Sequence, residues 1–225
     1  MTRPVAKPKS SAHRAFDELR EMIFSGELLA GSDHLETELA MRLGLSRTPI
    51  REAALMLESQ GLLELRPRKG VRILPVSAED MREIYDVLTE LESLAAERAA
   101  QAGYGAHDLA ALSRAIDDMD RAIAAEDLEA WAAADDRFHT ELVRLGGNTR
   151  VAGIVAMMSA QVRRARRATL WIRPLPTQSN EDHRRVLTAI AEGNADEARR
   201  LHRAHRQAAK ETLVELLEKF RLQGV

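Results

Sequence analysis

The residues best suited to bind a metal lie in the second half of the chain, on stretches with a helical repeat. Asp135 and His139 are four residues apart, so on a helix they project from one inner face. His183 and His205 each share a face with apolar residues of two later stretches. Three imidazoles and a carboxylate directed inward from three helices suit a first-row divalent metal, with positions left open for water or a ligand carboxylate. A lone histidine on an apolar face is more often a core residue, so a metal site is expected only because these four residues occur together.

The same residues are compatible with two other functions. A metal-bound water beside a general base would make the protein a metal-dependent hydrolase or lyase. A metal that is itself the signal would make it a metal sensor. The sequence contains no glycine-rich phosphate loop, no serine nucleophile motif and no further acid or base within a motif. We therefore expect no enzyme activity and keep metal sensing as the alternative.

A second group of residues could bind DNA, although the overall charge argues against it at first. The 225 residues carry 33 Lys and Arg against 35 Asp and Glu, a net charge of -2. Residues 42–72, however, hold seven basic and three acidic side chains. Within this window Arg47 and Arg51 project from one helical face, where a guanidinium can bond the O6 and N7 atoms of guanine. The basic excess is local and fits a DNA-reading surface.

The elements that position these arginines form a small domain. One helix ends near Gly26, and a second over 36–43 is closed by Gly44. A third helix begins with either Ser46 or Thr48 as its cap. Apolar segments over 62–65 and 71–74 then flank a basic stretch with a glycine, which predicts a β-hairpin. Two helices with a tight turn and a two-stranded ribbon describe a winged helix-turn-helix.

The rest of the chain is predicted to be a helical bundle, so the fold is mainly α. Six helices are expected, or seven if the boundaries are misplaced, over 78–102, 107–125, 127–145, 149–169, 179–192 and 195–221. The predicted organisation is a disordered arm (1–10), a winged helix-turn-helix (11–75), a linker (76–78) and a ligand-binding and dimerisation domain (79–222). The sequence has no cysteine and no stretch typical of a signal peptide or membrane span, so we expect a cytoplasmic protein without a membrane partner.

The first domain resembles the GntR family of bacterial transcription regulators. The resemblance is carried by residues 36–40, 45–53, 57–62 and 66–71, above all by the Ser-Arg-Thr-Pro-x-Arg-Glu-Ala stretch that starts at Ser46. Together with the charge pattern, it implies DNA contacts by Arg47, Thr48, Arg51, Arg66, Arg68, Lys69 and Gly70. Gly70 is expected to allow close approach of the hairpin tip to the minor groove. Ala30 and His34 depart from the family pattern.

The second domain is similar to the FCD domain of the FadR subfamily, near its VanR-like branch. The similarity is carried by Tyr85-Asp86-Val87, Leu91-Glu92, Phe138 and Gly147-Asn148, together with the Asp and His residues named above. It implies a metal, with zinc or nickel expected, held by Asp135, His139, His183 and His205. It also implies a small carboxylate effector nearby.

One departure from this subfamily concerns the effector. The subfamily commonly has an Arg after Tyr-x-Val, where this chain has Leu88 and Thr89. Any one of Arg163, Arg164, Arg166 and Arg167 would replace that charge if it points inward, although such a run more often lies on a solvated face; of these we select Arg164 as the expected effector residue. The expected effector residues are therefore Tyr85, Leu88, Thr89, Asn148 and Arg164. The implied protein is a homodimeric regulator, expected to be a repressor, on a near-palindromic double-stranded operator.

Overall fold

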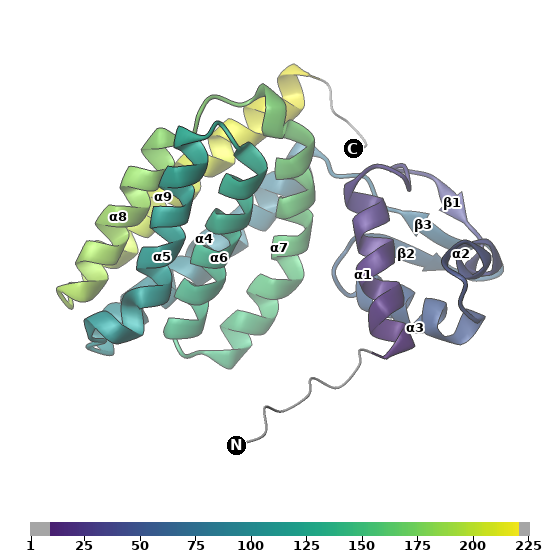
Figure 1. The fold of residues 1–225 in the computed structure, drawn as a ribbon, viewed down its shortest axis with the longest axis horizontal. Helices are drawn as coiled ribbons and strands as arrows, with labels where there is room; N and C mark the ends of the chain where they lie inside the picture. The colour runs from purple at the N-terminus through teal and green to yellow at the C-terminus, as the bar shows by residue number, and fades with distance from the viewer. Residues whose placement is uncertain (1–9, 221–225) are drawn as a thin grey trace. The chain divides into compact units, whose positions relative to one another are not determined.

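The computed structural model describes residues 10–220, so the predicted arm over 1–10 lies almost wholly outside the described residues. The described chain divides after Val76 into two compact units (Figure 1). The predicted linker at 76–78 overlaps the next helix, because Ser77 caps that helix and Ala78 begins it. Within residues 10–220, no helix has both the length and the apolar character needed to cross a bilayer.

The first unit combines three helices with a small sheet. Its elements are α1 (Ser11–Phe24), β1 (Asp33–His34), α2 (Glu36–Leu43), α3 (Arg47–Glu58), β2 (Leu63–Arg66) and β3 (Gly70–Ile73). α1 packs against α3, which buries Ile50 and Leu57 completely. Gly44 closes α2 with a φ of 64°, as predicted. Ser46 occupies the cap position of α3, although its side chain makes no capping hydrogen bond.

The sheet has three antiparallel strands in the order β1-β3-β2, one more than the predicted hairpin. The additional strand, β1, pairs Asp33 with Arg72 of β3. It was missed because two polar residues carry no alternating apolar pattern. β1 also explains why residue 70 is a glycine, since a Cβ at this position would lie only 2.1 Å from the backbone oxygen of His34 in β1. Glycine is therefore required by packing inside the sheet, a reason different from the predicted approach to the minor groove.

The second unit is a bundle of six α-helices within the described residues. They are α4 (Ala78–Gln101), α5 (Ala106–Ala124), α6 (Leu128–Leu145), α7 (Thr149–Thr169), α8 (Thr177–Ala191) and α9 (Ala195–Lys219), with a 3-10 turn η1 (Leu170–Ile172) after α7. α4 packs along α9, α5 along α6, and α8 along α9. The predicted boundaries differ from these by two residues or fewer in the described part of the chain.

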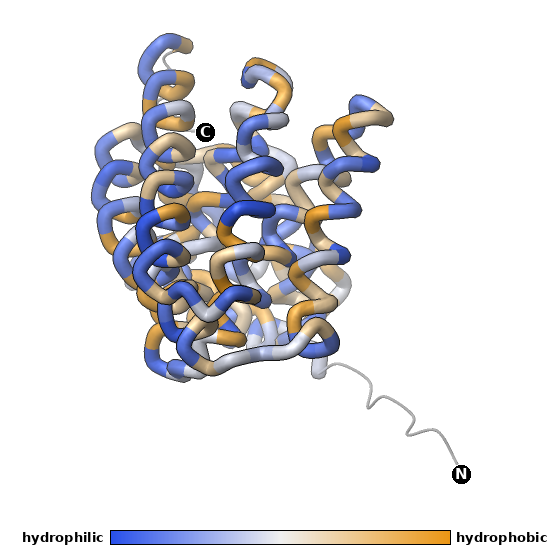
Figure 2. Tube along the Cα trace, turned by 90° about the vertical axis from the view of Figure 1, so that its left-hand side faces the viewer, coloured by the Kyte–Doolittle hydropathy of each residue, from blue (hydrophilic) through white to orange (hydrophobic). Residues whose placement is uncertain are grey.

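The bundle forms because each helix has an apolar stripe that faces the interior. Hydrophilic and hydrophobic residues alternate along the helices with the helical period (Figure 2). Trp131, Phe138 and Val186 are buried in the common core. Polar side chains within this interior are therefore exceptions that need partners. The predicted metal ligands are among these exceptions.

Candidate functional site

The predicted DNA-reading arginines lie side by side at the start of α3. The side chains of Arg47 and Arg51 are 67% and 66% exposed, so both guanidinium groups are available to a ligand in solvent. Each lies near a different carboxylate oxygen of Glu36, at 3.5 and 3.4 Å. Glu36 is itself nearly buried at the first turn of α2. Thr48 is exposed beside the two arginines. α2 therefore anchors the carboxylate that orients the arginines of α3.

The basic residues of the hairpin fall into two groups. Arg68 and Lys69 are exposed in the turn between β2 and β3. Arg66 is half-buried, and its guanidinium lies 3.5 Å from both Asp33 and Glu64. Arg68 has a φ of 64°, so the chain reverses there through a left-handed residue. The two tip residues are free to meet an anion, whereas Arg66 also ties β2 to β1.

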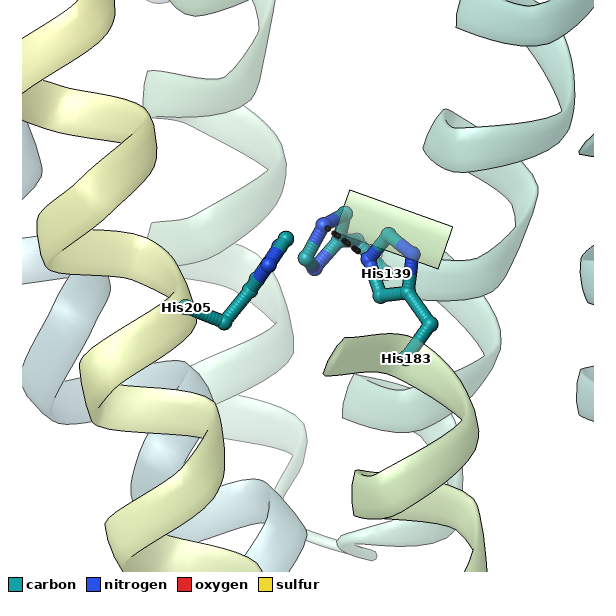
Figure 3. A group of neighbouring side chains, drawn as sticks. All are labelled: His139, His183 and His205. Carbon is teal, nitrogen blue, oxygen red and sulfur yellow. Dashed lines mark hydrogen bonds between the residues drawn. The ribbon is translucent and has the colours of Figure 1, made fainter. Parts of the chain in front are cut away.

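The three predicted histidine ligands converge inside the bundle from three helices. His139 comes from α6, His183 from α8 and His205 from α9, and Figure 3 shows their rings gathered at one point. The Nε2 atoms of His139 and His183 are 3.4 Å apart. One nitrogen from each ring lies within 4.8 Å of the others, and all three residues are buried. This spacing is short enough for a single ion to contact all three.

Asp135 lies beside this histidine cluster, one turn before His139. Its two carboxylate oxygens are each 3.7 Å from a histidine Nε2, one from His183 and one from His139. Arg166 donates a hydrogen bond of 2.6 Å to one of these oxygens. Burial alone would raise the pKa of Asp135, but Arg166 and the two histidines outweigh it and keep the pKa below its ordinary value. The carboxylate is therefore ionised.

Burial lowers the pKa of two of the three histidines of the cluster, which favours the neutral form that binds a metal. Burial, followed by the neighbouring His205, places the pKa of His183 well below 6.5. Burial also lowers the pKa of His205, against the effect of Asp182. Metal coordination requires a neutral imidazole, so His183 and His205 are ready to bind without first losing a proton.

A second buried group adjoins the first and was not anticipated as a functional site. His139 Nδ1 lies 2.9 Å from Glu92 of α4, and His202 of α9 lies 3.5 Å from the same oxygen. Burial would raise the pKa of Glu92, but Arg206, His139 and His202 lower it to about 2. A charged residue within the apolar stripe of α4 was the available clue to Glu92. His202 lies on a face of α9 next to that of His205, and both faces are buried because α9 packs against both α4 and α8.

A cavity of about 240 Å³ opens directly next to the histidine cluster. Its wall is formed by helices α4, α6, α7, α8 and α9 and by the segment between η1 and α8. Its charged and aromatic lining consists of Tyr85, Trp131, Asp135, His139, Arg166, Arg173, Asp182, His205 and Arg206. Three arginines face two aspartates here, so with neutral histidines the lining carries a positive excess. The cavity thus offers an anion both positive charge and an adjacent metal-ligating cluster.

Of the predicted effector residues, only Tyr85 lines this cavity. Leu88 and Thr89 are buried in α4, and Asn148 caps α7 by accepting hydrogen bonds from Arg150 N and Val151 N. Arg164 is also buried but is absent from the cavity wall, where Arg166 lies instead. The arginine run spans several faces of α7, and sequence alone did not fix which face meets the bundle interior.

Each of the two units matches a known protein family. The sequence matches the family described as "Bacterial regulatory proteins, gntR family" over residues 11–73 and the FCD domain over residues 83–208. It is 41% identical over 139 residues to an uncharacterized HTH-type transcriptional regulator of Agrobacterium vitis, covering 60% of this chain and 81% of that protein. It is 32% identical over 135 residues to the gluconate operon transcriptional repressor of Bacillus licheniformis, covering 60% of this chain and 55% of that protein.

The fold also resembles solved structures. The structure of McbR/YncC from E. coli superposes with a TM-score of 0.77 at 20% identity and covers 95% of this chain and 100% of that one.

The GntR and FCD families consist of transcriptional regulators and not of enzymes, which excludes the hydrolase or lyase alternative. Because the FCD match alone covers more than half of the sequence, the chain belongs to the GntR family of bacterial transcriptional regulators and carries an FCD effector-binding domain.

Proposed function

We propose that the protein is a cytoplasmic, homodimeric repressor whose affinity for operator DNA is controlled by a small carboxylate bound beside a divalent metal. The main support for this proposal is the convergence of three buried histidines beside Asp135, because His139, His205 and Asp135 also line a cavity with a positive excess. Repression is supported by the gluconate operon relative, which is named a repressor.

The donor set fits a first-row divalent ion such as zinc or nickel. His139, His183 and His205 supply three nitrogen donors, and Asp135 supplies an ionised oxygen donor. Without cysteine in the chain, no thiolate competes for the ion. A bound divalent cation would provide a fixed positive charge that attracts a carboxylate into the cavity.

Neighbouring charged residues contact three of these proposed metal ligands. Arg166 holds the Asp135 carboxylate in place by a 2.6 Å hydrogen bond. Glu92 lies 2.9 Å from Nδ1 of His139, which favours the proton on that nitrogen and leaves Nε2 free to face the cluster. His205 Nδ1 has a similar, longer approach of 3.8 Å to Asp182. The Glu92 contact favours Nε2 of His139 as the nitrogen that binds a metal, whereas the longer approach of Asp182 to His205 does not by itself select a nitrogen.

Control of DNA binding requires that the effector favours one arrangement of the two DNA-reading units of a dimer. A dimer would place its two α3 helices in successive major grooves of a near-palindromic operator, with half-sites about one helical turn apart. An effector shifts operator affinity only by its differential affinity for the two arrangements. Typical coupling between two such sites corresponds to about a 5- to 150-fold change in affinity.

The test measures operator affinity in the presence of candidate effectors. The full chain loaded with zinc is titrated onto DNA from the region upstream of its own gene, with acetate, lactate, gluconate, succinate, citrate or benzoate added. We expect at least one of these acids to lower the affinity of the wild-type protein about 5- to 150-fold and to leave the His183→Ala variant unaffected. His107→Ala is the matched control, because His107 is fully exposed.

Two results would contradict the proposal. If none of the acids changes operator affinity, the carboxylate effector is wrong. If a chelator alone changes operator affinity as strongly in the absence of any acid, the metal is the signal and the protein is a metal sensor.

A further inference from the structure

The three arginines of the cavity differ in how their charges are satisfied. Arg166 of α7 is paired with Asp135 at 2.6 Å. Arg206 of α9 lies 3.3 Å from Glu92 and stacks over the ring of Tyr85 at 4.7 Å. Both cations therefore have a carboxylate partner within the protein. Arg173, in the segment between η1 and α8, is the third.

Arg173 has no carboxylate within ion-pair distance among residues 10–220. Its Nε atom is buried and lacks any hydrogen-bond partner in that part of the chain. Burial, followed by the nearby charge of Arg166, lowers the pKa of Arg173 to about 10, so the group still carries its charge at neutral pH. A buried cationic donor without a partner is costly, because the protein has not replaced its lost hydration. Arg173 as a whole is half-buried, so this cost concerns its Nε–H alone; the residue lines the cavity, where an anion would supply the missing acceptor.

The neighbouring wall indicates the kind of anion. Pro174 and Leu175 follow Arg173 directly in this wall, and Ala208 and Ala209 of α9 add further apolar surface. A small inorganic anion would leave these side chains without contacts. An organic acid would place its carboxylate on the guanidinium and its carbon skeleton on the apolar wall.

We infer that Arg173 is the residue that binds the carboxylate of the effector, and that the effector is a small organic acid with an apolar portion. The inference rests on the proposed function, since it assigns a residue and a ligand class to the same cavity. It places the anion-binding cation on the segment before α8. Arg164 on α7 and the buried, uncharged Leu88 on α4 do not contribute to the cavity wall.

The experiment compares acids with their uncharged amides by calorimetry on the zinc-loaded full chain. The probes are benzoate with benzamide, succinate with succinamide, and inorganic sulfate. The variants are Arg173→Gln, Arg173→Lys and the control Arg150→Gln, which changes an exposed arginine on α7. Zinc content and operator binding are measured for each variant, so that a folding defect is recognised independently of ligand binding.

We expect the wild-type protein and the control to bind at least one of the two acids more tightly than its amide and more tightly than sulfate. Arg173→Gln should bind that acid about 10- to 100-fold more weakly, the range expected when a charge-assisted hydrogen bond is lost. Its zinc content and operator binding should be unchanged. Arg173→Lys should lie between the two, because a lysine keeps the charge but not the planar donor pair.

Three outcomes would overturn the inference in distinguishable ways. If Arg173→Gln binds the acid as well as the wild-type protein, the assignment of Arg173 fails while the proposed function stands. If sulfate binds as tightly as the acids, the ligand class is wrong. If the wild-type protein prefers neither acid to its amide, both the inference and the carboxylate effector of the proposed function fail.

Discussion

Glu36 and Glu92 play similar roles in the two units. Each is a buried carboxylate that contacts two side chains of a candidate binding site. Glu36 lies between the two exposed arginines of α3. Glu92 lies between His139 and Arg206, at 2.9 and 3.3 Å from its two oxygens. In both cases the carboxylate fixes the orientation of another side chain and does not face the ligand surface itself. We therefore expect DNA binding and metal binding to depend on these two carboxylates as well as on the side chains that they contact.

Arg47 and Arg51 are the residues on which DNA recognition is expected to depend. Replacing both Arg47 and Arg51 with Ala should weaken operator binding, because each guanidinium that bonds a guanine contributes about 1–3 kcal/mol of discrimination. Gel-shift titration at fixed salt measures the loss. Arg20→Ala is the control, since that side chain is paired with Asp17 on α1. Unchanged binding by the double variant would remove α3 from the recognition surface.

The second residue prediction concerns the support of His139. Glu92→Gln keeps the shape of the side chain but removes the charge next to Nδ1, and it should lower zinc affinity about 10-fold. Competition with a chelator of known affinity provides the measurement. Glu90→Gln is the matched control, because Glu90 lies on the same helix with its side chain 46% exposed. Equal zinc affinities in the two variants would contradict the role of Glu92.

At the scale of elements, helix packing decides which polar residues meet. α9 contacts α4 with one face and α8 with another, which is why His202 and His205 are both buried although they lie on neighbouring faces. The sequence predicted the helices and the three histidines of the cluster, because an isolated polar residue within an apolar stripe is visible in the pattern. It could not predict Arg173 as part of the cavity, since the direction of a connecting segment depends on tertiary packing.

Close packing of α6 on α4 leads to a prediction about stability. A Cβ on Gly146 would lie 2.7 Å from the Cα of Ala95, so Gly146→Ala should force these helices apart. We expect a loss of about 1–3 kcal/mol in the free energy of unfolding, measured with urea. Gly153→Ala in α7 is the control, because nothing lies within 4 Å of its added Cβ. That control should be neutral or stabilising by about 0.5–1 kcal/mol; equal losses would contradict the close contact.

The buried histidines predict a pH dependence for the metal-free protein. Burial lowers the pKa values of His183, His202 and His205 in the folded state, although Glu92 acts in the opposite direction on His202 and Asp182 does so on His205. Below about pH 6.5 the unfolded chain takes up protons that the folded chain does not, so stability falls as the pH falls. The slope is at most about 1.4 kcal/mol per pH unit for each group. Glu92 does not contribute between pH 7.5 and 5.5, since its carboxylate is ionised there in both states.

Urea unfolding of the metal-free protein at pH 7.5, 6.5 and 5.5 measures this slope. His202→Gln should reduce the slope, because it removes one of the three groups while leaving the proposed metal ligands intact. His107→Gln should leave it unchanged, since His107 is fully exposed. A slope of zero in the wild-type protein, or equal slopes in both variants, would contradict the effect of burial.

At the scale of the whole molecule, two units of different charge share a chain with a net charge of -2. The basic excess is concentrated in residues 42–72, around α3 and the hairpin, and the bundle carries the acidic remainder. This division was predictable from the sequence, as were the helix-turn-helix and the six bundle helices. Strand β1 and the second histidine group were not, because each depends on residues brought together by distant parts of the chain.

Elemental analysis of the purified full chain shows whether the histidine cluster of the bundle holds a divalent metal. We expect about one zinc or nickel ion per chain in the wild-type protein and in the control His107→Ala. We expect loss of that ion from His139→Ala and His183→Ala, with the helical content of both variants retained. Equal metal content in all four proteins, or none in the wild-type protein after loading with zinc, would show that these histidines do not hold a metal.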